Sequence, residues 1–302
     1  PFDKFTPKTE QEMMEWINTH DVAINITPEY FNSLTIKTDA ELAEEVQFWD
    51  EIYSQIPNIK QLYFAGGEPL IIKEHKMFLE EIIRRGYASQ IHLRYNTNVL
   101  MLDDAMIDIW KQFKIVKVGV SLDATEDRNY YIRYPSDWNT IVQNLHKLDN
   151  TPDNIQVTIA LAAQILNIKH IPDFIKWKVT SNFKKINKQI NASGYMQGGG
   201  LIGVHLLWIP TWLSMRALPL EDKKEVREKF EELKTWLEAN YKEDESLDKN
   251  PWGWKRWEGI LDWMDEVDDS HLLPDFKEYI QTMDKQRGTN FKQIFPELAH
   301  LV

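Results

Sequence analysis

The sequence contains no cysteine in 302 residues. From its own residues the chain can therefore form no disulfide, no thiolate nucleophile and no cysteine-held metal cluster. It also has no apolar run near the roughly 20 residues that a membrane helix needs. Residues 1–15 are polar and charged, unlike a secretory leader. We expect a cytoplasmic protein with no membrane partner.

Positive charge is scarce as well. The chain has 35 Lys and Arg against 47 Asp and Glu, which gives a net charge of −12 and a pI of about 5.2. A general nucleic-acid binder would show a basic face, so this composition argues against that class. Hydrophobic residues make up 43% and aromatic residues 12% of the chain. That is enough for the core of one large domain or two small ones.

Short apolar runs alternate with amphipathic segments along the middle of the chain. The apolar spacing predicts helices at 39–55, 74–85, 103–113, 138–148 and 171–180. Strands are expected at 62–65, 91–95, 116–120, 155–163 and 204–209. In the helix at 74–85 we expect Met77 to point inward and Gly86 to end the helix, and we expect residues 125–137 to form a connection. Such alternation with short connections is typical of parallel strands joined by right-handed crossovers. A doubly wound sheet and a complete or partial barrel both remain, although five units are too few for an eight-stranded barrel.

Three stretches organise the chain. Residues 1–38 lack clean periodicity, residues 39–220 hold the alternating core, and residues 221–302 are helical and rich in tryptophan. We expect the charges of a long helix at 221–241 to form a solvated face. Four tryptophans follow, and we expect them to dock helices on the core rather than to stack a flat ligand: Trp252, Trp254, Trp257 and Trp263. An Asn- and Gly-rich linker is expected at 187–200.

The first predicted strand ends in Gly66, Gly67, Glu68 and Pro69. The glycines let the backbone turn sharply and approach another group closely. Glu68 places a carboxylate at the carboxyl end of the strand, the edge where parallel α/β folds bind ligands. Taken alone, this short motif is more typical of an ordinary βα turn than of a ligand site.

The following strands end in the same polar way, with Asn96, Asn98, Ser121, Asp123, Gln164 and Asn167. If the strands are parallel, these groups form a ring at one edge with few cations. Such a ring suits a small zwitterionic, sugar-bearing ligand. A polyphosphate would require a P-loop or Rossmann glycine pattern, and neither is present. The histidine spacing does not predict a metal site.

These stretches resemble the radical S-adenosylmethionine (SAM) superfamily, and most closely its twitch-domain (SPASM-like) branch. The resemblance rests on YFAGGEPL at 63–70, YNTN at 95–98, VSLDA at 120–124 and YYIRYPSDW at 130–138. It runs from about residue 39 to 225 and more weakly to the end. It implies a partial (β/α)6 barrel that holds SAM at the strand carboxyl ends. Here the first strand and cluster loop are missing, and a helical C-terminal extension is added.

The family pattern also implies roles for individual residues. The segment 66–69 would bind the methionine amino group of SAM through its backbone and through Glu68. Ser121 and Arg133 match positions that contact the methionine carboxylate, and the planar fork of an arginine suits that group. Asp123 would contact SAM or fix the turn. The side chains expected to reach SAM or the substrate are Asn96, Asn98 and Asn167.

The chain departs from the family at the iron–sulfur cluster. The family holds a [4Fe–4S] cluster in a CxxxCxxC loop, takes electrons from a flavodoxin or ferredoxin, and cleaves SAM reductively to a 5′-deoxyadenosyl radical. Without cysteines this chain is expected to be inactive alone. The missing first strand favours a fragment of a longer enzyme that carries the cluster loop. The alternative is a cluster-free, non-catalytic module that binds a SAM-like ligand or a partner.

A further hypothesis is an unrelated (β/α) enzyme that uses Glu68 and Asp123 as acid and base. If the chain is part of a radical SAM enzyme, its motifs do not specify the substrate, because that family modifies peptides, sugars, cofactors and nucleic acids. The acidic composition favours a peptide or a small molecule over nucleic acid.

Overall fold

A computed structural model describes residues 39–186, 202–240 and 254–302. The chain divides into two compact units, residues 1–55 and residues 56–302. In the first unit the structure describes α3 (Asp39–Gln55), whose bounds are those expected from its apolar spacing. The predicted irregular segment 1–38, the linker 187–200 and Trp252 lie outside the described residues. The predicted division at residue 220 stays a prediction.

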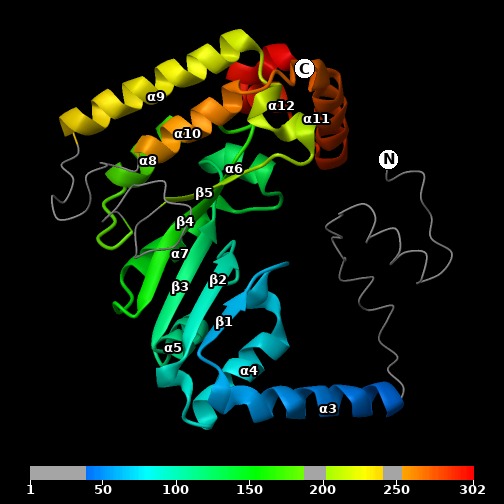
Figure 1. Cartoon of the computed structure of the whole chain (residues 1–302), viewed down its shortest axis with the longest axis vertical. Coiled ribbons are helices and arrows are strands. Elements are labelled where there is room, and N and C mark those ends of the chain that lie inside the picture. The colour runs from blue at the N-terminus through cyan, green and yellow to red at the C-terminus, as the bar shows by residue number, and fades with distance from the viewer. Residues whose placement is uncertain (1–38, 187–201, 241–253) are drawn as a thin grey trace. The chain divides into compact units, whose positions relative to one another are not determined.

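Five parallel strands form the sheet of the second unit, in the order β1-β2-β3-β4-β5 (Figure 1). They are β1 (Gln61–Phe64), β2 (His92–Thr97), β3 (Ile115–Ser121), β4 (Ile155–Ala163) and β5 (Ile202–Leu206). A doubly wound sheet reverses its strand order at a switch point. Here every crossover steps to the next strand in the same direction, as in a barrel. The fold is therefore an α/β fold with an open, barrel-like sheet.

The crossover helices cover the sheet with the apolar residues that recur at helical spacing in the sequence. They are α4 (Lys73–Arg84), α5 (Asp104–Trp110), α7 (Trp138–Asp149) and α8 (Ile171–Thr180). The helices contribute the fully buried side chains of Leu79, Trp110 and Phe174 to the core. The central strands contribute those of Val118 and Ile159. Burial of large apolar side chains from both layers is the main stabilisation of such a sheet.

Local sequence signals set the helix ends. Asp103 begins α5, since its side chain accepts a hydrogen bond from the Met106 backbone N–H at 2.6 Å. Asp137 caps α7 in the same way, accepting from Thr140 N–H at 2.7 Å. After α4, Gly86 adopts a left-handed φ of 81°, which confirms the glycine stop expected there.

Three sequence-based expectations are wrong. Residues 125–137, expected to be a plain connection, contain the helix α6 (Glu126–Ile132). The last strand ends at Leu206 rather than at 209, because its partner β4 ends at the paired residue Ala163. Met77, expected to point inward from α4, is 49% exposed, whereas Leu79 fills the core.

The C-terminal region is helical, as expected. Figure 1 shows its helices gathered at the end of the sheet toward which the strands run. They are α9 (Leu220–Asn240), α10 (Trp254–Asp265), α11 (Leu273–Arg287), α12 (Phe291–Ile294) and the terminal 3-10 helix η9 (Pro296–Leu301). Among the described helices, none combines the length and apolar character that a membrane crossing requires.

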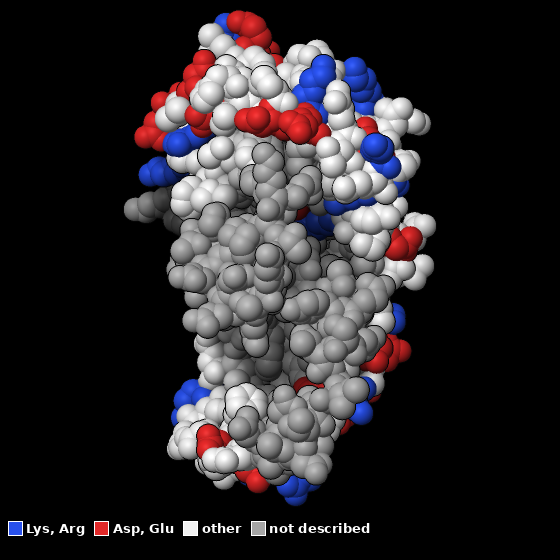
Figure 2. Space-filling model, turned by 90° about the vertical axis from the view of Figure 1, so that its right-hand side faces the viewer, with Lys and Arg blue, Asp and Glu red and all other residues white. Residues whose placement is uncertain are grey.

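The tryptophans and charges of this region differ in part from expectation. Trp254 and Trp257 are buried, but their aromatic contacts are with Phe230 of α9, at 6.5 and 5.1 Å between ring centroids, so they join α10 to α9. Asp222 and Lys223 of α9 are also buried, so its charges are not all solvated. On the face in Figure 2, acidic and basic side chains lie interspersed over the described surface.

Candidate ligand-binding site at the strand ends

Glu68 ties the turn after β1 to the end of β2. Its Oε1 accepts hydrogen bonds from Thr97 Oγ1 at 2.6 Å and from Leu70 N–H at 3.2 Å. Its Oε2 accepts from Asn98 N–H at 2.7 Å. Both carboxylate oxygens are thus engaged, and the side chain caps the 3-10 helix η3 (Pro69–Ile71). Glu68 fixes the shape of the turn.

The two glycines make the backbone of this turn accessible. Gly66 and Gly67 have φ of 89° and 53°, in the left-handed region that favours glycine, and both are exposed. A Cβ built on either residue would meet no heavy atom within 4 Å. The turn therefore presents open backbone at the strand end, where a ligand can approach.

The end of β2 is held in a strained conformation. Val99 is buried and has a left-handed φ of 56°, which is rare for a β-branched residue. Thr97 Oγ1 accepts its N–H at 3.0 Å, and Asn144 Nδ2 donates to its carbonyl at 2.7 Å. Asn96 Nδ2 donates to Tyr63 Oη at 2.8 Å, and Asn98 Oδ1 accepts from the Leu100 N–H at 2.9 Å. Backbone strain of this kind clusters at functional sites.

Asp123 and Arg133 form an ion pair beyond β3. Asp123 Oδ2 lies 2.8 Å from Arg133 Nε, and Oδ1 accepts from the Ala162 N–H at 2.7 Å. Asp123 is 3% exposed, so burial raises the pKa of its carboxyl, while Arg133 opposes that shift. The Arg133 side chain is 30% exposed. Its Nη groups make no hydrogen bond to any other described residue, so they are available to an anion.

Two asparagines frame this pair. Asn129 Oδ1 accepts from the Asp123 N–H at 3.1 Å. Asn167 Nδ2 donates to the carbonyls of Asp123 and Ala162, at 3.0 and 2.9 Å, and its Oδ1 accepts from Gln164 N–H at 2.9 Å. Asn167 is fully buried. Its amide is occupied by the protein, so the structure gives it a framing position. Ligand contact by Asn167 stays a prediction. Sequence reasoning missed Asn129, which lies in the unexpected helix α6.

The structure therefore gathers the predicted residues into two clusters. Gly66, Gly67, Glu68, Pro69, Asn96 and Asn98 form one, and Asp123, Arg133 and Asn167 form the other. Ser121 ends β3, half-buried and with no side-chain partner among the described residues. No hydrogen bond joins the two clusters within the described ranges. The carboxylates of Glu68 and Asp123 are both engaged, so the structure does not favour them as a free acid and base.

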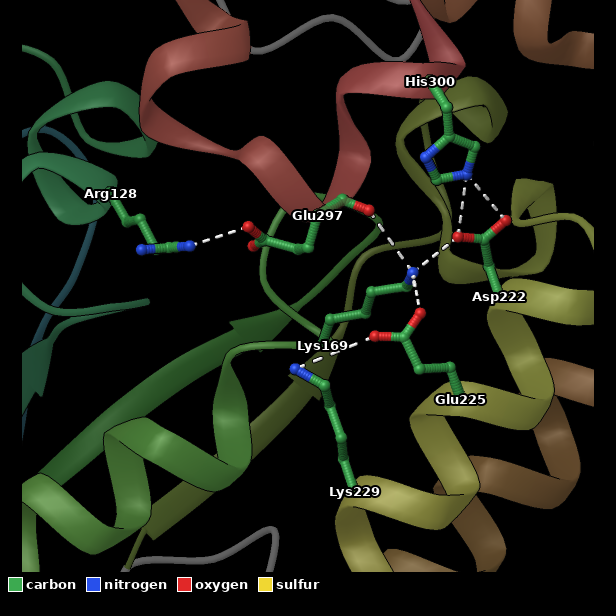
Figure 3. Close-up of polar contacts among 7 residues, drawn as sticks. All are labelled: Arg128, Lys169, Asp222, Glu225, Lys229, Glu297 and His300. Atoms are coloured by element: carbon green, nitrogen blue, oxygen red, sulfur yellow. Dashed lines mark hydrogen bonds and ion pairs between the residues drawn. The ribbon is translucent and has the colours of Figure 1, made fainter.

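A third polar cluster fastens the C-terminal region to the loop between β4 and α8 (Figure 3). Lys169 is 2% exposed and donates to Asp222 Oδ1 and Glu225 Oε2, both at 2.6 Å, and to the Glu297 carbonyl at 3.4 Å. His300 Nε2 lies 3.0 Å from Asp222 Oδ1. Because Lys169 follows Asn167 by two residues, this network anchors the loop that frames Asp123.

The C-terminal helices also hold α6, the helix that ends next to Arg133. Arg287 Nη1 donates to the Tyr131 carbonyl at 2.9 Å, and its guanidinium lies 4.6 Å from the Tyr134 ring centroid. Tyr131 is buried and packs on Phe295, at 5.3 Å between centroids. Another contact pairs Arg128 of α6 with Glu297 at 2.8 Å. No local pattern predicts these contacts, because they join residues more than 150 positions apart.

An open parallel sheet with crossover helices, and with polar groups at the carboxyl ends of its strands, defines a protein of the (β/α) class. Residues 27–177, half of the chain, match the model of the Radical SAM superfamily. The chain therefore belongs to the radical SAM superfamily. Neither the curated proteins nor the solved structures give a significant match to it. Membership of the twitch-domain branch stays a prediction.

The residues present fit one of the two cofactors that the family implies. The partly exposed Arg133 side chain, Ser121 and the open backbone at Gly66 and Gly67 suit the carboxylate and amino groups of SAM. They do not fit the [4Fe–4S] cluster, because the 302 residues contain no cysteine. Within the described ranges, no group of three His, Asp or Glu side chains is placed to hold a metal.

Proposed function

We propose that this chain is the SAM-binding part of a radical SAM enzyme that acts on a peptide or a small molecule. The observation that carries the proposal is the Asp123–Arg133 pair at the end of β3. The buried Asp123 carboxylate holds the Nε side of the Arg133 guanidinium, and the Arg133 side chain is 30% exposed near the edge where parallel strands bind ligands. An arginine held in this way is prepared to receive a carboxylate through its remaining donors.

Each residue has a distinct part in this proposal. Arg133 and Ser121 receive the methionine carboxylate, and the backbone at Gly66 and Gly67 receives the amino group. Glu68 holds that backbone in shape, with Pro69 behind it. The partly exposed amides of Asn96 and Asn98 face SAM or the substrate, and Asn167 supports Asp123. SAM bound there is the source of the 5′-deoxyadenosyl radical in this family.

The cluster ligands must come from outside these 302 residues, because this chain has no thiolate. We propose that a longer chain with a CxxxCxxC loop is the active form, that it works in the cytoplasm, and that a flavodoxin or ferredoxin reduces it. The second candidate is a cluster-free module that binds SAM or a partner without chemistry. The absence of cysteine is the observation that favours it. A longer chain that forms an oxygen-sensitive brown cluster would support the first candidate, and a protein that is complete without cysteines would support the second.

Calorimetry with SAM tests the binding proposal on the chain itself. We expect binding to the unmodified chain and a loss of about 10–100-fold in affinity for Arg133→Met, since a hydrogen bond between charged groups contributes about 1.5–3 kcal/mol. Arg84→Met is the matched control, because Arg84 is an exposed arginine paired with Glu81 on α4. Absence of SAM binding, or equal losses in both variants, would contradict the proposal.

A further inference from the structure

A pocket of about 500 Å³ lies beside the strand-end site. Its walls come from β5, from the short helices η5 (Thr211–Leu213) and η6 (Met215–Ala217), from α10, and from the turn before η8 (Ser270–Leu272). Small-molecule sites usually enclose roughly 300–1,000 Å³, so the pocket can hold an organic ligand. No residue of the predicted SAM site lines it.

His205 connects the pocket to the proposed SAM site. It lines the pocket from β5 and is paired in register with Ala162 of β4. The Ala162 N–H is the group that donates to Asp123 Oδ1. Burial raises the pKa of Asp123, and the electrostatic interaction with His205 lowers it. A ligand in the pocket would therefore lie next to the strand end that carries Asp123 and Arg133.

One wall of the pocket is rigid. The Arg216 guanidinium stacks on the Trp263 ring, 4.0 Å from its centroid, and Arg216 Nε donates to the Trp263 carbonyl at 3.0 Å. Arg216 Nη2 is paired with Glu266. These contacts occupy the guanidinium and one face of the indole, so this wall gives shape to the pocket and its charge is already neutralised.

Three other side chains that line the pocket are those of Arg256, Asp269 and Trp208. Among the described residues, neither the Arg256 guanidinium nor the Asp269 carboxylate makes a hydrogen bond or an ion pair. The indole of Trp208 lines the pocket while 64% of the residue is exposed. A free guanidinium binds a carboxylate, and an exposed indole packs against an apolar or aromatic group. The Asp269 carboxylate would repel a second negative charge on the ligand.

We propose that this pocket binds the substrate, and that the substrate carries a single carboxylate beside an apolar or aromatic group. Arg256 receives the carboxylate and Trp208 packs on the apolar part, while Asp269 disfavours dianions. The assignment as a substrate pocket rests on the proposed SAM site, whereas the recognition of a monocarboxylate does not. A free acid and the C-terminus of a peptide share this chemistry.

The test uses calorimetry with N-acetyl-L-phenylalanine and with its neutral amide, which share one apolar body and differ in the carboxylate. A tripeptide that ends in phenylalanine, with its own C-terminal amide as control, separates a peptide terminus from a small acid. We expect each acid to bind at least about tenfold more tightly than its amide. Arg256→Gln should remove that preference, and Asp269→Asn should strengthen acid binding by a few fold. Trp208→Ala should weaken acid and amide equally.

Lys114→Gln is the control for the loss of one positive charge, because Lys114 is exposed at the opposite, amino end of β3. It should leave acid binding unchanged. SAM affinity measured on the same variants separates the two claims, since Arg256→Gln should not alter it. If the chain prefers the acids to their amides but does not bind SAM, the pocket proposal stands and the SAM-site proposal is wrong. Failure of both acids to bind, or equal binding of acid and amide, would overturn the pocket proposal even if SAM binds.

Discussion

Replacing Arg133 by methionine should destabilise the protein in a pH-dependent way. The substitution leaves the Asp123 carboxylate, which is 3% exposed, without its charged partner 2.8 Å away. Breaking a fully buried pair costs about 3–5 kcal/mol. Since the Arg133 side chain is 30% exposed, water can reach the vacated position, and we expect about 2–3 kcal/mol near pH 8.

The sign of the pH dependence follows from the pKa of Asp123. Burial already raises that pKa in the folded protein, and loss of Arg133 should raise it further. A carboxyl whose pKa is higher in the folded than in the unfolded protein stabilises the fold at pH values below its pKa in the unfolded chain. That stabilisation is lost as the pH rises through its pKa in the folded protein. The deficit of Arg133→Met relative to the unmodified chain should therefore be largest at pH 8 and should shrink toward pH 5.

Urea unfolding of both proteins at pH 8 and pH 5 measures this difference, and effects of other titrating groups cancel in the comparison. The double variant Asp123→Asn with Arg133→Met removes the unpaired charge but retains an acceptor for the Ala162 N–H. It should recover stability at pH 8 relative to Arg133→Met and show a smaller pH dependence. A deficit that is independent of pH, and equal in single and double variants, would refute the reasoning.

Three other predictions concern the buried histidines His75 and His170, the turn at Glu68, and the contact of Arg287 with α6. Burial lowers the pKa of His75 and of His170 to about 4. Because the unfolded chain binds these protons first as pH falls, the free energy of unfolding should decrease by roughly 2–4 kcal/mol between pH 7 and pH 5. In urea unfolding, the double variant His75→Gln with His170→Gln should show a smaller decrease. Glu68→Gln should cost about 1–3 kcal/mol and accelerate hydrogen exchange in the turn that it caps. Arg287→Met should accelerate hydrogen exchange at 131–134, because it removes the contacts to Tyr131 and Tyr134.

Each of these has an outcome that contradicts it. If the free energy of unfolding depends on pH equally in the histidine double variant and in the unmodified chain, other groups cause the loss of stability in acid. Unchanged exchange in Glu68→Gln would mean that the glycine turn holds its shape without the carboxylate. The same acceleration in the control Arg84→Met as in Arg287→Met would indicate general loosening rather than loss of the contact to α6.

The alternation of strands and helices was predictable because its signals are local, whereas the order of the strands in the sheet was left open. Each strand is a short run rich in apolar residues, polar residues or glycines lie at or just after the ends of the first four, and parallel pairing brings those ends to one edge. Glu68 and Asp123 could therefore be placed at that edge from the sequence. Their partners could not, because a motif does not reveal whether a carboxylate faces the ligand or holds the protein backbone.

The features that sequence reasoning missed depend on distant residues. The helix α6 has no apolar stripe of its own, and Tyr131 is buried by Phe295 from the C-terminal end. The charge pattern of α9 is the same whether Asp222 is solvated or buried, and only the tertiary contact with Lys169 decides. Periodicity reports which face of a helix is apolar. It does not report which charges the fold pairs internally.

We propose above that Arg133 receives the carboxylate of SAM. The most direct measurement compares calorimetric binding of SAM with binding of decarboxylated SAM, which lacks only that group, to the unmodified chain, Arg133→Met, Arg133→Lys and Arg84→Met. We predict that SAM binds more tightly than its decarboxylated form by about 10–100-fold. Arg133→Met should abolish that preference, Arg133→Lys should retain part of it, and Arg84→Met should retain all of it. Equal binding of the two ligands by the unmodified chain would contradict the account.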